Sequence, residues 1–164
     1  YLLTYLRTSG SVEEQLSGYN FLAELFGGEP VAVWQGVGWL FYNAHFVATR
    51  MTGGFGGTRS VNFIAESDDG GLVLLYLVPI VLLVAAGLLV ARWDGADEVA
   101  DAATAGVTVV VGYLPLAIVG RFLFQYDGAV APDIVTALLL AGAVYPLVLG
   151  AIGGALWAVL DSSA

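Results

Sequence analysis

Long runs of uncharged, apolar residues alternate with short polar segments in the C-terminal part of the chain. Each run is about as long as the ~20 apolar residues that a helix needs to cross a bilayer. The pattern predicts three membrane-spanning helices, over 71–92, 102–124 and 134–160. Because backbone polar groups in lipid must be hydrogen-bonded within the chain, we expect an all-α membrane protein. Residues 1–164 would form a single membrane domain.

The first six residues are also apolar, but six residues are too few to span a bilayer. We interpret 1–6 as the end of a first membrane helix that begins upstream. A cleaved signal peptide is the alternative, although no small-residue cleavage pattern is visible. The expected architecture is therefore a four-helix transmembrane bundle with a truncated first helix.

The segment 11–27 has the pattern of an amphipathic helix. Ser11 and Glu14 have the spacing of a capping box at its start, and Gly27 and Gly28 would end it. One face of this helix would carry five apolar side chains: Val12, Leu16, Tyr19, Leu22 and Phe26.

Aromatic residues with polar edges mark the next segment, 30–51. Such residues favour the headgroup zone, so we expect an interfacial aromatic helix here. A glycine-rich connector over 52–58 and a short strand or extended arm over 59–66 would follow. Together with 11–27, this region forms the amphipathic and interfacial segment between the first and second membrane helices.

The charge of the chain is strongly negative. It has 14 acidic residues, five arginines and no lysine, which gives a net charge of −9, and every acidic residue lies outside the apolar runs. An acidic, lysine-free surface suits a halophilic, archaeal protein, because high salt screens the self-repulsion. The same charge disfavours nucleic acid as a partner.

Missing residue types exclude several kinds of chemistry. The chain has no cysteine, which excludes disulfides, thiolate nucleophiles and iron–sulfur ligation. The lack of lysine excludes a Schiff base, and a single histidine excludes multi-histidine zinc and bis-histidine haem sites within one chain. We therefore expect no cofactor, no metal site and no catalytic residue.

His45 is the only plausible acid–base centre, with Asn43, Arg50 and Glu66 as expected neighbours. A neutral histidine in an aromatic segment is more often a hydrogen-bonded structural residue than a catalyst. Arg121 could carry a gating or anion-binding charge. The more common role is an arginine that reaches the headgroups or pairs with Asp127 or Asp133.

Two further sets of residues have a pattern that indicates packing or anchoring. Small residues at four-residue spacing let helices approach closely, within the chain or toward a partner. The predicted helix-packing residues are Gly142, Pro146, Gly150, Gly154 and Ala158. The predicted membrane-interface anchors are Trp34, Trp39, Tyr42, Arg92, Trp93 and Arg121.

The segments 1–10 and 11–26, the run from Trp39 to Phe46 and the run Gly112-Tyr113-Leu114-Pro115-Leu116 together resemble an uncharacterised family of small haloarchaeal multi-pass membrane proteins. The likeness covers essentially the whole chain. It implies four spans, with the beginning of the first helix upstream of Tyr1. It implies no catalytic residues that could be assigned.

The leading hypothesis is a non-catalytic protein of the cell membrane, a structural or accessory subunit that contacts the lipid bilayer and other membrane subunits or a second copy. The alternative is a small-solute channel or transporter. It rests on three prolines within the predicted spans and on a weak echo of Pro79, Gly87 and Asp94 in Pro146, Gly154 and Asp161. A membrane-embedded enzyme that uses His45 is the third hypothesis.

Overall fold

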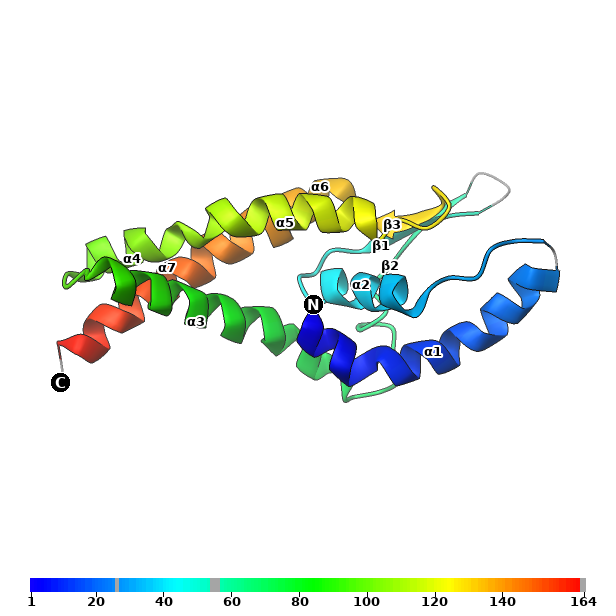
Figure 1. The fold of residues 1–164 in the computed structure, drawn as a ribbon, viewed down its shortest axis with the longest axis horizontal. Coiled ribbons are helices and arrows are strands. Elements are labelled where there is room, and N and C mark those ends of the chain that lie inside the picture. The colour runs from blue at the N-terminus through cyan, green and yellow to red at the C-terminus, as the bar shows by residue number, and fades with distance from the viewer. Residues whose placement is uncertain (26, 54–56, 163–164) are drawn as a thin grey trace.

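The computed structural model describes residues 1–25, 27–53 and 57–162. Figure 1 shows an elongated molecule, with long helices at one end and a mixed helical and stranded part at the other. We call the long helices, residues 72–123 and 134–161, the apolar bundle. We call residues 1–70 together with 125–133 the cap.

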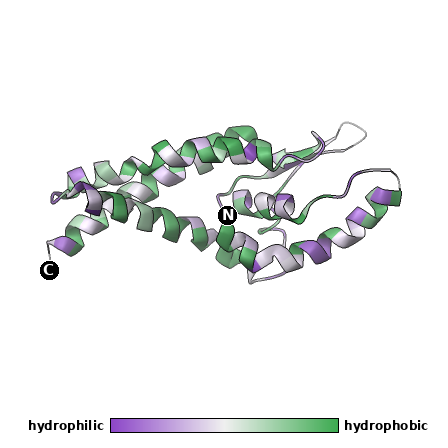
Figure 2. Cartoon of the chain, in the orientation of Figure 1, coloured by the Kyte–Doolittle hydropathy of each residue, from purple (hydrophilic) through white to green (hydrophobic). Residues whose placement is uncertain are grey.

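The apolar bundle has three long helical segments within the described part of the chain, each long and apolar enough to cross a bilayer. The first is a 3₁₀ turn, η1 (Leu72–Tyr76), that continues into α3 (Leu77–Asp94). The second joins α4 (Val99–Val107) to α5 (Val109–Leu123). The third comprises α6 (Ile134–Thr136), the π-helical η2 (Ala137–Val144) and α7 (Tyr145–Asp161). Figure 2 shows mostly hydrophobic residues along all three.

The third segment lies at the centre of the bundle. Helix α7 packs along both α3 and α4, and η2 packs along α5, whereas α3 and α5 make little contact with each other. Helices α3 and α5 diverge toward the cap (Figure 1).

Irregular turns within the bundle have local causes. Thr108 separates α4 from α5, and its hydroxyl donates to the carbonyl of Ala105 (2.6 Å), competing with the regular helical bond. Pro146 lacks the N–H that a carbonyl one turn earlier would accept, and the chain changes there from π-helix to α-helix. Proline is well tolerated in the first turn of a helix.

The cap begins with one long helix, α1 (Leu2–Leu25), so the predicted division into an end of a helix over 1–6 and a capped helix over 11–27 is wrong. Ser11 lies in the middle of α1 and donates to the carbonyl of Thr8 (3.0 Å), so it starts no helix. The buried positions of α1 are Thr4, Thr8 and Val12.

The predicted apolar face of this helix is only partly buried. Val12 is buried and Leu16 half-buried, whereas Tyr19 and Leu22 are exposed. The fifth predicted member, Phe26, lies outside the described residues.

The predicted helix over 30–51 is also too long, because α2 covers only Val33–Asn43. The side chain of Asn43 donates to the carbonyl of Val47 (2.8 Å), and Phe46 adopts a left-handed conformation (φ 57°). Both features turn the chain out of the helix. It continues as a strand, β1 (Thr49–Thr52).

A small antiparallel sheet completes the described part of the cap, with the strand order β2-β1-β3. Strand β1 pairs with β2 (Thr58–Val61) and with β3 (Val130–Pro132). The strand expected in 59–66 therefore ends at Val61. The connector between the last two spans, expected to be a simple loop, supplies β3 and so attaches to the cap.

Candidate functional site

The only histidine of the chain lies where the cap meets the apolar bundle. His45 follows α2 and is fully buried. Its Nδ1 lies 2.8 Å from the carbonyl oxygen of Phe41, and its Nε2 lies 2.7 Å from the hydroxyl of Tyr113 in α5. Because a carbonyl can only accept, Nδ1 carries a proton. In the neutral imidazole Nε2 then accepts from the hydroxyl of Tyr113, so both ring nitrogens have a partner within the chain.

Aromatic rings surround this imidazole. The ring centroids of Phe41 and Tyr145 lie 4.7 Å and 5.1 Å from that of His45. Burial lowers the pKa of His45 to about 4, although the hydrogen bond with the Phe41 carbonyl acts in the opposite direction. The site therefore favours the uncharged form at neutral pH.

The charged neighbours predicted for His45 have other partners. Arg50 pairs with Asp133 across the sheet (3.4 Å), and Glu66 pairs with Arg59 (2.7 Å). Burial alone would raise the pKa of Asp133, but hydrogen bonds from Thr136 and Arg50 lower it overall. Arg50 and Glu66, expected as neighbours of His45, therefore make their ion pairs elsewhere.

Asn43 is a structural centre that the sequence did not single out for this role. Its amide donates to the carbonyl of Val47 (2.8 Å) and to Thr49 Oγ1 (3.3 Å), and its Oδ1 accepts from the N–H of Phe63 (2.8 Å). The side chain is fully buried. It therefore joins the end of α2, the start of β1 and the segment after β2.

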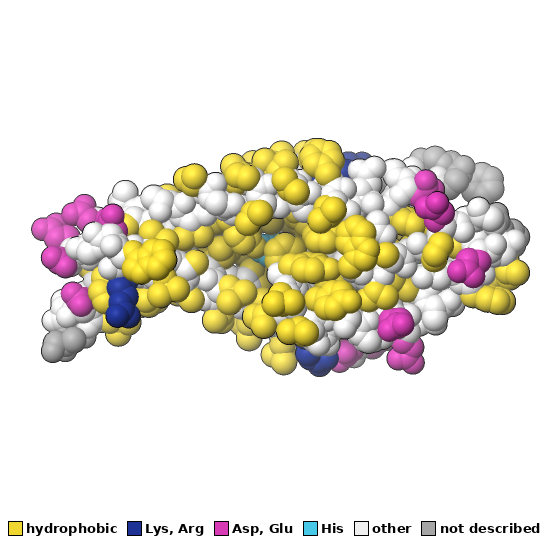
Figure 3. Space-filling view, in the orientation of Figure 1, with side chains coloured by type: hydrophobic (Ala, Val, Ile, Leu, Met, Phe, Trp, Pro, Cys, Tyr) yellow, Lys and Arg dark blue, Asp and Glu magenta, His cyan; other side chains and the backbone are white. Residues whose placement is uncertain are grey.

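A crevice of about 470 Å³ opens between α3 and α5, next to His45. Aliphatic side chains line most of it, among them Val78, Leu82 and Ala86 from α3 and Val109, Leu116 and Val119 from α5. Figure 3 shows hydrophobic side chains around this hollow in the middle of the molecule. The crevice is therefore an apolar space at the depth of the predicted spans.

Three tyrosines line the crevice, and the protein itself occupies their hydroxyl donors. Tyr1 donates to the carbonyl of Trp34 (3.0 Å), Tyr42 to the carbonyl of Ala117 in α5, and Tyr113 to His45. Burial of paired polar groups of this kind fixes the geometry of a junction. The crevice thus offers mainly hydrocarbon to an occupant.

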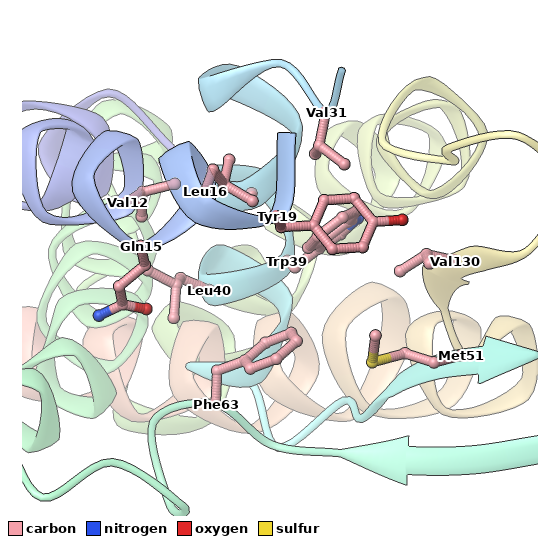
Figure 4. Close-up of a pocket in the computed structure, with 11 residues that line it drawn as sticks. Val12, Gln15, Leu16, Tyr19, Val31, Trp39, Leu40, Met51, Phe63 and Val130 are labelled. Atoms are coloured by element: carbon pink, nitrogen blue, oxygen red, sulfur yellow. The ribbon is translucent and has the colours of Figure 1, made fainter. Parts of the chain in front are cut away.

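A second hollow lies in the cap, beneath α1 (Figure 4). One part has a volume of about 240 Å³, with Leu16, Trp39 and Val130 among its walls, and we call it the inner chamber. The adjoining part, of about 520 Å³, has charged residues in its wall, and we call it the mouth. The two parts together are the α1 cleft.

The predicted helix-packing residues lie on contacts within the chain. A Cβ atom added to Gly154 would approach the backbone of Ala102 in α4, and one added to Gly87 in α3 would lie 2.7 Å from the Cα of Gly150. Gly142 faces Leu114 of α5. Pro146 and Ala158 are buried as well. The structure places this row toward α3, α4 and α5.

Two of the predicted interface anchors are not at the surface. Trp39 is 6% exposed and donates its indole N–H to the carbonyl of Phe124 (2.8 Å), and Tyr42 is fully buried. These aromatic residues connect α2 to the end of α5, so the prediction that they reach the headgroups is wrong.

The other predicted anchors lie at the surface or near it. Trp34 and Trp93 are exposed. The guanidinium carbon of Arg92 lies 5.5 Å from the ring centroid of Trp157. Arg121 donates to Gln125 Oε1 (2.8 Å), an acceptor that differs from the expected Asp127 or Asp133.

A family model matches residues 1–161, and its family is described as a family of unknown function (DUF7978). The chain belongs to this family. The expected resemblance to an uncharacterised family is confirmed, whereas a haloarchaeal origin stays a prediction. No curated protein and no solved structure is significantly similar to the chain.

The match to DUF7978 extends from α1 to α7, so it covers the cap and the apolar bundle together. The junction around His45 and the α1 cleft lie within this matched region. Among residues 1–25, 27–53 and 57–162, no group of three His, Asp or Glu side chains is arranged to hold a metal ion.

Proposed function

We propose that this DUF7978 chain is a non-catalytic, multi-pass protein of the cell membrane that serves as a structural or accessory subunit. Apolar side chains on the outer surface of the bundle support a lipid environment; Val111 of α5 and Val81 of α3 are 73% and 61% exposed. Acidic side chains lie at the free end of the bundle and over the cap, away from the apolar side chains of the middle (Figure 3).

The crevice between α3 and α5 is the observation that carries the proposal. In a membrane, helices associate through close packing, and an apolar gap between two diverging helices leaves contacts unmade. The occupant we propose is an apolar membrane helix that lies along the gap and completes a four-helix bundle. Tyr1 forms part of the wall, so this helix would contact the N-terminal end of α1 as well as α3 and α5.

The same wall argues for a hydrocarbon occupant rather than a polar solute. A pathway for a small polar solute needs polar groups along its length. The hydroxyls of Tyr1, Tyr42 and Tyr113 donate to groups of the protein, and the neighbouring side chains are aliphatic. This favours the subunit role over the channel or transporter.

The geometry of His45 supports a non-catalytic role. A general base must present an unoccupied nitrogen to the substrate within hydrogen-bond reach. Both ring nitrogens of His45 are engaged, and the side chain is fully buried. The imidazole is therefore suited to joining α2 to α5.

Site-specific cross-linking in native membranes tests the proposal. The chain has no cysteine, so one introduced cysteine is unique. Leu116→Cys places a photo-cross-linker in the crevice, and Ile152→Cys places the same reagent at an exposed position of α7 outside the crevice as a matched control. Cross-linked peptides are then identified by mass spectrometry.

We expect Leu116→Cys to capture a membrane helix much more often than Ile152→Cys does. A helix of a different subunit or of a second copy supports the subunit role. A helix of the same chain supports the four-helix bundle and counts against the subunit role. Capture of lipid alone at both positions would overturn both parts of the proposal.

A further inference from the structure

The α1 cleft has two adjoining parts with different polarity. Five residues line both parts: Val12, Gln15, Leu40, Met51 and Phe63. The inner chamber, of about 240 Å³, is larger than the ~150 Å³ apolar cavity that is known to bind benzene. Together with the mouth it falls in the size range of ligand sites.

Hydrocarbon makes up most of the wall of the inner chamber. Leu16, Val31 and Val130 add aliphatic groups to the five shared residues. The indole N–H of Trp39 is used by the carbonyl of Phe124 (2.8 Å), so this tryptophan offers its ring to an occupant. Figure 4 shows these side chains pointing toward one space from α1, α2, β1, β3 and the segments before α2 and after β2.

The mouth of the cleft is partly polar and carries both signs of charge. Arg59 pairs with Glu66 (2.7 Å), and both side chains remain substantially exposed. Asp68 adds a second carboxylate, and Ser11 and Ser67 add hydroxyls. The charges in this wall therefore sum to a small negative excess, on a chain with a net charge of −9.

We propose that the α1 cleft binds a single-chain amphiphile, with its hydrocarbon chain in the inner chamber and an uncharged or zwitterionic head at the mouth. Burial of the chain would supply most of the binding free energy. The mouth offers hydroxyl, carboxylate and guanidinium groups to a polar head. It disfavours an anionic head, which would lie beside two carboxylates and a guanidinium that is already paired.

Helix α1 forms one wall of the cleft and is attached on both sides of it. Toward its C-terminal end, the side chain of Asn20 makes two hydrogen bonds with the backbone of Val31 (2.8 Å and 3.0 Å). Toward its N-terminal end, Thr4 and Thr8 are buried. These attachments hold α1 over the cleft from both ends.

Quenching of Trp39 fluorescence tests the proposal in nanodiscs. Trp34, Trp93 and Trp157 are first replaced by phenylalanine, so that Trp39 alone reports on the inner chamber. The probes are a monoacylglycerol and a fatty acid that carry bromine atoms on the same position of the acyl chain. We expect saturable quenching by the monoacylglycerol and clearly weaker quenching by the fatty acid at alkaline pH.

A pair of substitutions on α1 separates the cleft from the bilayer as the source of quenching. Gln15→Phe fills the passage between the mouth and the chamber, and Ser17→Phe adds the same ring about 200° around the helix. We expect Gln15→Phe to weaken apparent binding roughly tenfold, the loss expected when about two methylene groups are excluded. Ser17→Phe should leave binding unchanged.

Three results would overturn the inference. The first is the absence of saturable quenching, and the second is equal quenching in the Gln15→Phe and Ser17→Phe proteins, which would place the probe in the bilayer. The third is tighter binding of the fatty acid, which would contradict the argument from charge. None of these results depends on what fills the crevice between α3 and α5.

Discussion

Gly154 lies at a close approach of α7 to α4, and replacing it with alanine tests the packing of the apolar bundle. A Cβ atom at this position would lie 2.7 Å from the carbonyl carbon of Ala102 and 3.1 Å from the Cα of Ala103. Both atoms belong to the backbone of α4, so no side-chain rotation can relieve the overlap. The two helices would have to move apart.

The size of the effect follows from two opposing contributions. Overpacking of a close contact typically costs about 1–3 kcal/mol, and more where backbone must move. Alanine is favoured over glycine within a helix by about 1 kcal/mol. We therefore expect Gly154→Ala to lower the free energy of unfolding by about 2 kcal/mol, which corresponds to roughly 4–8 °C in Tm for a chain of this size.

Gly112 provides the matched control, because a Cβ atom added there meets no other atom within 4 Å. Gly112→Ala makes the same chemical change in α5 and should leave the Tm unchanged or slightly raised. The assay is thermal unfolding of both purified variants in one detergent, followed by circular dichroism. A Gly154→Ala protein as stable as the Gly112→Ala protein would refute the packing argument.

Three further predictions concern the cap and the charge of the chain. Asn43→Ala leaves the N–H of Phe63 and the carbonyl of Val47 without their buried partner, and should lower the free energy of unfolding by about 3 kcal/mol in denaturant titrations; a loss below about 1 kcal/mol would contradict this role. The pKa of His45 is about 4 in the folded chain and near 6.5 in an unfolded one. Its contribution to stability is complete above pH 6.5 and is lost as the pH falls toward 4, by up to about 3 kcal/mol. The slope of stability against pH should be smaller for His45→Gln, and equal slopes would count against the assignment. Raising NaCl from about 0.1 M to about 1 M should raise the Tm, because salt screens the repulsion within a chain of charge −9; an unchanged Tm would argue against a high-salt environment.

The three apolar helices could be predicted because their evidence is local. A run of about 20 uncharged residues has few alternatives to a spanning helix, and the structure moves the predicted ends by only a few residues. The interruption at Thr108 and the π-helical turn before Pro146 are harder to predict. They depend on how individual side chains and missing N–H groups are accommodated by the neighbouring turns.

The cap was harder to predict because its structure depends on contacts distant in sequence. Strand β3 has three residues, and only its pairing with β1 makes it a strand. Ser11 and Glu14 have the spacing of a helix start, yet α1 continues through both because Thr8 and Val12 pack on one face. Trp39 and Tyr42 resemble interface residues by type, and their burial follows from partners at the end of α5 and within it, Phe124 and Ala117.

The candidate site was only partly accessible to prediction for the same reason. His45 stands out as the only histidine, but its partner Tyr113 lies 68 residues away and no spacing relates the two. The α1 cleft combines residues from α1, α2 and the strands, none of which has a recognisable motif. The cleft is recognised by its shape, which forms only when these distant segments pack together.

On the proposal that the three apolar helices span a membrane, the pairing of β3 with β1 keeps two turns on the same side of it. The turn at Asp127 and Gly128 and the turn at Asp68 and Asp69 must lie in the same compartment, because the sheet that joins them cannot be divided by a bilayer. The acidic turn before α4 and the end of α7 lie at the opposite end of the molecule (Figure 1). A reagent confined to one face of the membrane would therefore label either both of the first two turns or neither.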